Sequence, residues 1–550
     1  MTRLLAVVTQ CLLIIGVLQP LCLNAGPTVA QLQQRLGPSA DQLEGPWLQY
    51  TSHLAAITIS GVPLSQTLGP LLDYKFSSTP AQLRRAVVNA GLKPRMKRFV
   101  RDLQAGRQVS VGAIGTSVSW GTGAVTRGTE DFISMLQVAL QAAFPRASVK
   151  MRNGCSPATG SGFTNMCLQH MVDPNVDLLI MEFNTNDFVT DEAFFNQPVT
   201  LAYERLMRKV LQLQRRPCVV QVQWPGWTQC WNASQHGKAS FIHSFEDQHA
   251  LVAQYYSVPS LSVRAAWWHE AEAGFAGRSA QLHLQPPMTP HGWIDIVTPD
   301  MVHPNNVGHR ALLDMFMWLV LQTAVDLALT PLARTDAELI WRPLPPPLHP
   351  GNWEESSQLC LVEEGLGQAV QAERSTGWQL VNEGTAEKRK IGYVSTTAGS
   401  ILTWSLNLTS ILGDMSSRQQ LPARPGTAAP AAASAGVAIG YLQSYTHMGT
   451  VLVECIKGCT CPAQEVDAHH TQRTSTTFIK LIKVNATEIV CTMQVTVLPR
   501  TSSGGHKFKV TALMMAPFDS LGFHWSENTA AQWEVHDLLS GVYDKNHRQP

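Results

Sequence analysis

A serine and an aspartate–histidine pair, far apart in this sequence, carry the side chains that acyl transfer requires. Ser117 follows the apolar run 109–114 in a turn that contains glycine, and Asp300 lies three residues before His303. A serine hydroxyl becomes a nucleophile when an imidazole accepts its proton and a carboxylate orients that imidazole. The residue types therefore predict Ser117 as the nucleophile, His303 as the base and Asp300 as the group that orients the base.

Both assignments have alternatives in the sequence. Ser119 lies two residues after Ser117 and is the competing nucleophile. The spacing of Asp300 and His303 also fits the start of a helix, where the Asp300 carboxylate would interact with the helix dipole. The sequence leaves these alternatives open.

The elements that must position these side chains follow an alternating pattern. Short apolar runs with the length of strands occur at residues 109–114, 149–152, 176–183, 218–224 and 261–266. Segments with helical periodicity are expected at residues 132–143, 201–213 and 307–324. Strands that alternate with helices predict a three-layer α/β/α domain, in which helices cover both faces of a parallel sheet.

Two further loops are expected at the same edge of the sheet as Ser117, because the carboxyl ends of parallel strands meet there. Residues 153–160 follow the second strand and residues 184–187 follow the third. Hydrogen-bond donors in such loops stabilise the oxyanion that develops during acyl transfer. These loops are therefore the candidates for an oxyanion hole.

Four blocks of residues, in this order, resemble those of the SGNH/GDSL hydrolase family. They are Gly115-Thr116-Ser117, the glycine loop at Gly160, Asn184-Thr185-Asn186-Asp187 and Asp300-x-x-His303. The resemblance covers roughly residues 108–326 and implies a flavodoxin-like fold with Ser117, His303 and Asp300 as a catalytic triad. It also implies an oxyanion hole made of the backbone N–H groups of Ser117 and Gly160 and the side chain of Asn186.

The sequence departs from the family pattern at two positions and leaves the oxyanion residues open. Thr116 stands where the family usually has Asp, and Asn184 stands where it often has Gly. The glycine loop also contains Gly154 and is followed by Gly162, and Asn186 fits a residue that only caps a turn. Asp187 and His309 are interpreted as structural residues, and Trp224, Trp227 and Trp231 as buried aromatic residues rather than a sugar platform.

The first 25 residues are typical of a secretory signal peptide. They contain Arg3, the apolar runs 4–8 and 11–17, and a small residue at Ala25. A signal anchor that stays in place is the alternative. We identify no other segment that is long and apolar enough to span a bilayer, so no stable membrane span is expected after signal cleavage.

Glycosylation sequons and cysteine usage agree with a secreted protein. Sequons begin at Asn232, Asn407 and Asn485. Of the 11 cysteines, Cys11 and Cys22 lie in the signal segment, which leaves an odd number and predicts at least one thiol that is free or pairs between chains. The late cluster predicts disulfides, because its spacing is irregular for zinc: Cys455, Cys459, Cys461 and Cys491. We expect no metal and no other cofactor.

The length of 550 residues predicts more than one domain. The expected organisation is a signal peptide over 1–25, a helical and loop-rich region over 26–107 that packs on the catalytic domain, a catalytic domain over 108–335, a proline-rich linker over 336–354 and a β-sandwich-like accessory domain over 355–550. Short β-branched runs indicate that last domain, at residues 401–408, 437–442, 450–455, 476–482, 489–497 and 507–515. The Ala/Pro tract 423–436 within it is expected to be a flexible surface loop.

These features favour a secreted serine esterase that hydrolyses O-acyl esters, with acetyl esters on glycans as the favoured substrates. A formal net charge of +1 gives no reason to expect a nucleic-acid partner. The alternatives are a lipid ester as substrate, an O-acyltransferase with the same acyl-enzyme, and an inactive glycan-binding protein. The sequence leaves the acyl chain, the alcohol and the oligomeric state open. A fragment that ends near Ala333 is expected to keep activity on a small ester.

Overall fold

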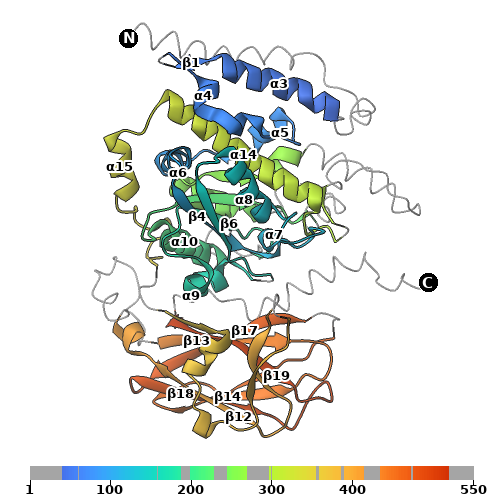
Figure 1. Cartoon of the computed structure of the whole chain (residues 1–550). Coiled ribbons are helices and arrows are strands. Elements are labelled where there is room, and N and C mark those ends of the chain that lie inside the picture. Colours follow the sequence, from blue (N-terminus) through green and yellow to red (C-terminus); the bar gives the residue numbers. More distant parts are fainter. Residues whose placement is uncertain are drawn as a thin grey trace, which may run out of the picture.

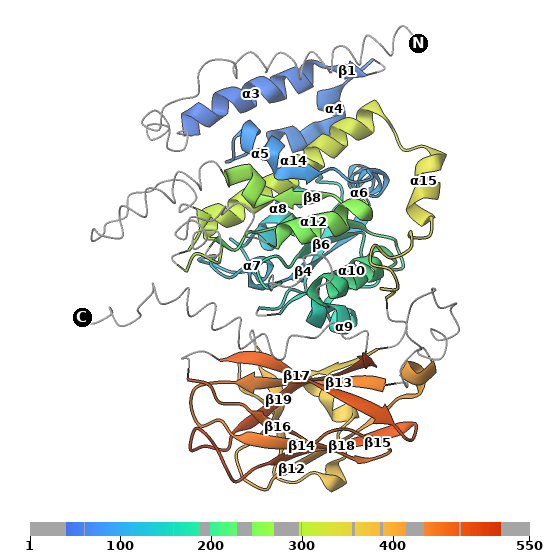
Figure 2. The same cartoon turned by 180° about the vertical axis from the view of Figure 1, so that it is seen from behind.

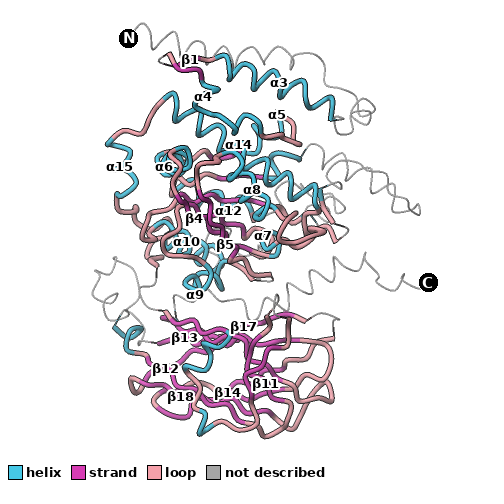
Figure 3. Tube along the Cα trace, viewed as in Figure 1, coloured by secondary structure: helices cyan, strands magenta, loops and turns pink. Residues whose placement is uncertain are grey.

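The chain forms an α/β part, over residues 40–341, and a β-sandwich, over residues 358–518 (Figure 1). The computed structural model describes residues 40–59, 61–157, 159–187, 198–227, 245–268, 296–298, 300–354, 358–385, 389–413, 434–471 and 475–518. Figure 3 shows that helices and strands alternate in the α/β part, whereas the second part consists mainly of strands.

A parallel sheet of five strands forms the centre of the α/β part. The strands are β4 (Gln108–Gly115), β5 (Ser148–Asn153), β6 (Leu178–Glu182), β7 (Cys218–Gln223) and β8 (Ser260–Ser262). Their spatial order is β5-β4-β6-β7-β8, and β3 (Val87–Asn89) pairs antiparallel with β8 at one edge. Read in chain order this is 2-1-3-4-5, the flavodoxin-like arrangement. The predicted fold class is confirmed.

Helices cover both faces of this sheet, as Figures 1 and 2 show from opposite sides. Helices α6 (Pro94–Gln104), α8 (Phe132–Ala143) and α14 (Asn306–Leu329) contribute to the apolar core on one face. Helices α9 (Ser161–Met171), α10 (Pro198–Leu211) and α12 (Glu246–Tyr255) contribute to the core on the other. Strands β6 and β7 are buried along their whole length, because helices pack on both sides of them.

The N-terminal elements pack on α14. They are α3 (Ala40–Ala56), β1 (Thr58–Ile59), β2 (Val62–Pro63), α4 (Leu64–Leu68), the 3-10 turn Gly69–Asp73 and α5 (Pro80–Ala86). Trp47 stacks on Phe76 with ring centroids 4.4 Å apart, and both rings contact Trp318 of α14. The buried carboxylate of Asp314, also on α14, accepts a hydrogen bond of 2.8 Å from Tyr74.

Helix α14 corrects one expectation from the sequence. Its 24 residues are apolar enough to cross a membrane by length and composition, and 72% of its most apolar window is buried inside the protein. A helix that packs on the sheet on one side and on the N-terminal elements on the other is apolar on both. The expectation that no second segment reaches this length and hydropathy is therefore wrong.

The fifth strand of the sheet is shorter than its apolar run predicts. Strand β8 ends at Ser262, and residues 263–268 are helical. The hydroxyl of Ser262 accepts a hydrogen bond of 2.8 Å from the backbone N–H of Ala265. This contact caps the helix and ends the strand, which apolar periodicity alone does not indicate.

Two antiparallel sheets form the β-sandwich. One has the order β10-β11-β19-β13-β17-β15, with β9 also paired to β19, and the other has the order β12-β18-β14-β16. The strands at predicted positions are β12 (Ile401–Asn407), β13 (Ser434–Gln443), β14 (Thr450–Lys457), β17 (Thr476–Ala486), β18 (Val490–Val497) and β19 (Phe508–Pro517). The shorter strands, which the patterns do not predict, are β9 (Leu359–Val362), β10 (Gln379–Asn382), β11 (Ile391–Ser395), β15 (Cys459–Thr460) and β16 (Gln464–Asp467).

The start of β13 corrects the boundary of the expected Ala/Pro loop. Ser434, Ala435 and Gly436 lie in β13 and are buried, because this strand pairs with β17 on one side and β19 on the other. The rest of the tract, residues 423–433, lies outside the described residues.

Three disulfides occur among the described residues. Cys455 pairs with Cys461 and Cys459 pairs with Cys491, so the prediction of disulfides in the late cluster is confirmed. The third disulfide joins Cys167 of α9 to Cys360 of β9. The thiols of Cys155 and Cys218 are free and buried, and Cys230 lies outside the described residues.

Candidate active site

The turn that presents Ser117 follows β4 directly. Thr116 caps helix α7 (Ser117–Trp120), and its hydroxyl accepts a hydrogen bond from the backbone N–H of Val118. Gly115 is required here, because a Cβ atom at this position would lie 2.4 Å from the backbone oxygen of Glu182. The close approach of β4 and β6 thus fixes where the turn begins.

A buried carboxylate lies beneath this turn. Glu182 Oε2 accepts a hydrogen bond of 2.7 Å from the hydroxyl of Thr116 and one of 3.3 Å from the hydroxyl of Ser119. Burial raises the pKa of the Glu182 carboxyl, and the hydrogen bonds from Thr116 and Ser119 offset only part of this effect. Ser119 is fully buried and its hydroxyl donates to Glu182, whereas the hydroxyl of Ser117 contacts His303.

Ser117, His303 and Asp300 form a continuous chain of hydrogen bonds. Ser117 Oγ lies 2.8 Å from His303 Nε2, and His303 Nδ1 lies 2.7 Å from Asp300 Oδ2. The other carboxylate oxygen of Asp300 accepts from the backbone N–H groups of Val302 and His303 and, at 2.5 Å, from the hydroxyl of Thr298. The structure thus brings together three side chains that lie up to 186 residues apart in the sequence.

The contacts of Asp300 keep it ionised. Burial raises the pKa of its carboxyl, but the hydrogen bonds and charge of His303, with the hydrogen bond from Thr298, outweigh burial and hold the pKa well below its ordinary value. Asp300 does not cap the following helix, because the Asn305 side chain accepts from the N–H of Gly308 at the start of α14. The alternative role at the start of a helix therefore belongs to Asn305.

Residues that sequence patterns do not assign to the site hold the His303 loop in place. The indole of Trp224 donates a hydrogen bond of 2.6 Å to the backbone oxygen of Val302. The Asn184 amide in turn donates one of 3.0 Å to the backbone oxygen of Trp224. Trp224 is buried, as interpreted from its place after a strand. That place at the carboxyl edge of the sheet is also the signal for its contact with the loop.

Gly160 and Asn186 lie in two loops that are joined by hydrogen bonds. Gly160 is the cap residue of α9, and the Asn186 amide donates a hydrogen bond of 2.9 Å to the backbone oxygen of Thr159. Asp187 accepts a hydrogen bond of 3.0 Å from the backbone N–H of Ser161. None of the hydrogen bonds found among the described residues uses the backbone N–H of Ser117 or of Gly160, so both remain suitable donors to an oxyanion.

The other glycines of this region fit the oxyanion role less well. The backbone N–H of Gly154 donates to the backbone oxygen of Ala113 at 2.9 Å, so this donor is occupied. Gly162 lies inside α9. Among the glycines that the sequence leaves open, Gly160 is therefore the candidate that the geometry favours.

Two histidines near the site have structural contacts. His249 lies 3.1 Å from Asp187 and stacks on Tyr203, and burial lowers the pKa of its ring. His309 contacts the backbone oxygen of Thr122 at 3.2 Å, and burial lowers its pKa to about 4. The partners of both rings are therefore structural ones, and the hydrogen bond of Ser117 is with His303.

Two of the predicted glycosylation sites lie on the surface of the β-sandwich. Asn407 and Asn485 are exposed. Asn232 and Trp231 lie outside the described residues.

Comparisons with known proteins identify the fold. No protein-family model matches the chain, and no curated protein sequence matches it. A solved structure described as a two-domain esterase (CEX) active on acetylated mannans is similar at 16% identity with a TM-score of 0.56, and the match covers 79% of this chain and 98% of that one. The same esterase co-crystallised with mannopentaose matches at the same identity and TM-score, over 79% of this chain and 97% of that one. At this identity, the likeness shows that this chain shares the two-domain fold.

Proposed function

We propose that this protein is a secreted serine esterase of the SGNH type that hydrolyses O-acyl esters, with acetylated glycans as its substrates. The observation that carries this proposal is the hydrogen-bonded chain from Ser117 through His303 to Asp300 at the carboxyl edge of the parallel sheet. A serine nucleophile, an imidazole that accepts its proton and a carboxylate that orients the imidazole are what an acyl-enzyme mechanism requires.

The proposed reaction has two steps. Ser117 Oγ attacks the ester carbonyl while His303 Nε2 takes its proton, and the same proton then passes to the alcohol that leaves. His303 next takes a proton from water, which attacks the acyl-enzyme. His303 then gives this proton to Ser117 Oγ as the carboxylic acid leaves, and the free Ser117 hydroxyl is restored. In both steps the N–H groups of Ser117 and Gly160 and the side chain of Asn186 would stabilise the oxyanion.

The substrate class rests on the fold and on the compartment. The two-domain structure that this chain resembles is described as active on acetylated mannans. The signal-like N-terminus, the sequons and the three disulfides favour an extracellular location, where acetylated polysaccharides are available.

The test of the nucleophile is the variant Ser117→Ala. We expect it to lose activity on an aryl acetate by a factor on the order of 10³ or more and to lose labelling by a fluorophosphonate. Ser148→Ala, an exposed serine at the start of β5, is the matched control and is expected to behave like the wild type. Full labelling of Ser117→Ala would contradict the assignment, and a loss that occurs only in Ser119→Ala would move it to that residue.

Product analysis tests the reaction and the substrate. The acetate released from acetylated mannan and acetylated xylan, and the phenol released from a long-chain aryl ester, are measured with and without an acceptor sugar. We expect release of free acetate from the glycans at a rate that the acceptor does not change. Transfer of the acetyl group to the acceptor would instead identify an acyltransferase.

A further inference from the structure

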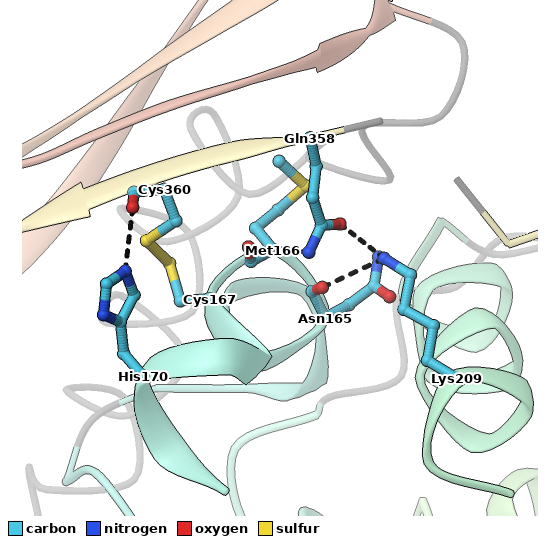
Figure 4. The surroundings of a disulfide bond; sticks show 7 residues. All are labelled: Asn165, Met166, Cys167, His170, Lys209, Gln358 and Cys360. Atoms are coloured by element: carbon cyan, nitrogen blue, oxygen red, sulfur yellow. Dashed lines mark hydrogen bonds between the residues drawn. A yellow bond between two sulfur atoms is a disulfide. The ribbon is translucent and has the colours of Figure 1, made fainter. Parts of the chain in front are cut away.

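Helix α9 links the candidate oxyanion loop to the β-sandwich. It begins at Ser161, directly after Gly160, and its second half lies against strand β9 (Figure 4). No other helix of the described α/β part is joined to the sandwich by a disulfide. The position of this helix therefore depends on both parts of the molecule.

A disulfide makes the attachment covalent. Cys167 of α9 and Cys360 of β9 form a disulfide although they lie 193 residues apart in the sequence. The two cysteines are only 1% and 2% exposed. Reductants react with thiols and disulfides that they can reach. The burial of Cys167 and Cys360 therefore indicates a structural disulfide that stays formed, rather than one that is reduced and formed again in regulation.

Polar side chains hold the same stretch of α9. Cys167 departs from helical dihedral angles, with φ −113° and ψ 18°, so the helical ladder is interrupted here. The backbone oxygen of Met166 accepts a hydrogen bond of 3.0 Å from Gln358, and that of Asn165 accepts one of 3.1 Å from Lys209 of α10. Figure 4 shows that Gln358 also contacts the Lys209 ammonium, so residues of both parts share one network.

An apolar contact surrounds the disulfide. Met166 and Cys167 form a buried cluster with side chains of β9, β13, β17 and β19, namely Cys360, Ala438, Ile479, Ala512, Met514 and Ala516. The His170 ring adds a contact of 2.9 Å to the backbone oxygen of Cys360. Several independent contacts thus fix α9 on the face of the larger sheet of the sandwich.

The other end of α9 is held by the candidate site itself. Asp187 accepts from the backbone N–H of Ser161, and Asn186 donates to the backbone oxygen of Thr159. Gly160 precedes Cys167 by two helical turns, which is about 10 Å along a helix. The residues between Gly160 and Cys167 are helical, and the departure from helical dihedral angles comes at Cys167 itself. We therefore expect a shift of the helix next to Cys167 to move the N–H of Gly160.

We propose that the β-sandwich is a positioning part of the active site, and that Cys167, Cys360 and Gln358 act through α9 to aim the Gly160 N–H at the oxyanion. This inference rests on the proposed esterase function. The physical reason is that an oxyanion donor stabilises the transition state only when it is preorganised, and loss of one donor costs a factor of about 10² to 10³ in kcat.

The test is the double variant Cys167→Ala/Cys360→Ala in the full chain, assayed on a small aryl acetate. Active enzyme is counted by fluorophosphonate titration, so that unfolded protein does not enter kcat. We expect kcat per titrated site to fall by about tenfold or more while KM changes by less than about threefold, as for an interaction made only in the transition state. The inhibition constant of a boronic acid, which forms a tetrahedral adduct with Ser117, should rise by the same factor.

The matched control removes a disulfide elsewhere in the same domain. Cys455→Ala/Cys461→Ala breaks the bond between β14 and the residue that follows β15, and neither cysteine belongs to the buried cluster around Cys167. It is expected to leave kcat per titrated site and the boronic acid constant unchanged. If the Cys167 and Cys360 variant behaves like this control, the inference is wrong.

A second variant decides the case in which the double variant does not fold. Gln358→Met keeps the disulfide and removes the hydrogen bonds that Gln358 makes with the Met166 carbonyl and with the Lys209 ammonium. It is expected to lower kcat severalfold with KM retained. Unchanged kcat in this variant would overturn the inference. A failure of the proposed function gives a different result. In that case Ser117→Ala, in which the contacts of α9 are unchanged, would keep activity and fluorophosphonate labelling.

Discussion

At the scale of single residues, Thr116 stands where the SGNH/GDSL pattern usually has Asp. A carboxylate from another strand, that of Glu182, contacts Thr116 instead. The Thr116 hydroxyl donates to Glu182 at 2.7 Å, so an acidic group lies under the nucleophile turn although the turn itself has none. Glu182 is fully buried and also receives hydrogen bonds from the Ser119 and Thr185 hydroxyls. This network holds the turn from below and leaves the Ser117 hydroxyl free to contact His303.

Asp300→Asn is the residue-scale prediction. The amide cannot favour the imidazole tautomer that accepts from Ser117, so we expect kcat to fall on the order of 10³ to 10⁴ with the fold intact. Because the wild-type contacts hold the pKa of Asp300 low, its carboxylate stays charged as the pH falls. Asp300 is then not expected to add a second proton to the loss of wild-type activity in acid.

The measurement is a profile of log kcat/KM against pH for the wild type, with circular dichroism of both proteins as the control for folding. An acid limb with the slope of a single proton agrees with this mechanism. A limb with the slope of two protons, or an Asp300→Asn variant with wild-type turnover, would contradict it.

At the scale of elements, the proline-rich segment that connects the α/β part to the β-sandwich packs on helix α10. Glu204 of α10 is fully buried and accepts hydrogen bonds from the His349 ring at 2.6 Å and the Asn352 amide at 2.8 Å. One turn later, Arg208 donates to the backbone oxygen of Pro345 and pairs with Glu354. Two adjacent turns of one helix therefore hold the connection in place.

Glu204→Gln is the element-scale prediction. Burial raises the pKa of the Glu204 carboxyl, but hydrogen bonds from His349, Tyr256 and Asn352 outweigh it and lower the pKa to about 2 from an ordinary value of 4.5. A lowered pKa stabilises the folded state above the unfolded pKa, and this stabilisation is lost as the pH falls through the folded pKa. The shift corresponds to about 3 kcal/mol at pH 7, and to roughly half of that near pH 3.

Urea unfolding of the wild type and of Glu204→Gln at pH 7 and at pH 3 measures this contribution. We expect the difference in free energy of unfolding to be larger at pH 7 than at pH 3. Glu338→Gln on α15 (Arg334–Trp341) is the control, because that side chain is 66% exposed. A difference for Glu204→Gln that is the same at both pH values would show that the carboxylate charge does not contribute.

At the scale of the whole molecule, the two parts share a core as well as a connection. The cluster around Cys167 contains residues of α9 and of four strands of the sandwich, and all of its core members are buried. A truncation in the linker would expose this apolar surface and leave Cys167 without its partner. The contacts thus give a physical reason to expect that the α/β part depends on the sandwich.

Truncation after Ala333 is the prediction at this scale, and it reverses the expectation that the sequence favours. We expect the fragment to aggregate or to lose most of its activity even on a small soluble aryl ester. The measurement is size-exclusion chromatography followed by fluorophosphonate titration and assay on an aryl acetate. A monomeric fragment with wild-type kcat per titrated site would contradict this prediction and would favour a sandwich that acts only on polymeric substrates.

The sequence by itself determined the succession of strands and helices along the catalytic region and the local partners of the candidate site. Apolar runs separated by helical segments indicate a parallel sheet, and that topology puts every strand end at one edge, so Ser117 and Asn186 are found there from the pattern. The pairing of Asp300 with His303 is equally local, because the two residues are three apart and share one turn. These features depend on periodicity and short range geometry.

Only the tertiary structure decided which distant side chains support that edge. The Trp224 indole on Val302, the Glu182 carboxylate under Ser119 and the disulfide between Cys167 and Cys360 each join segments that are far apart in the sequence. Such contacts depend on how helices and sheets pack, and several partners satisfy the same local pattern. The sequence gives no pairing for Cys167 or Cys360. Packing alone determines that the disulfide between them joins α9, the helix that follows Gly160, to the β-sandwich.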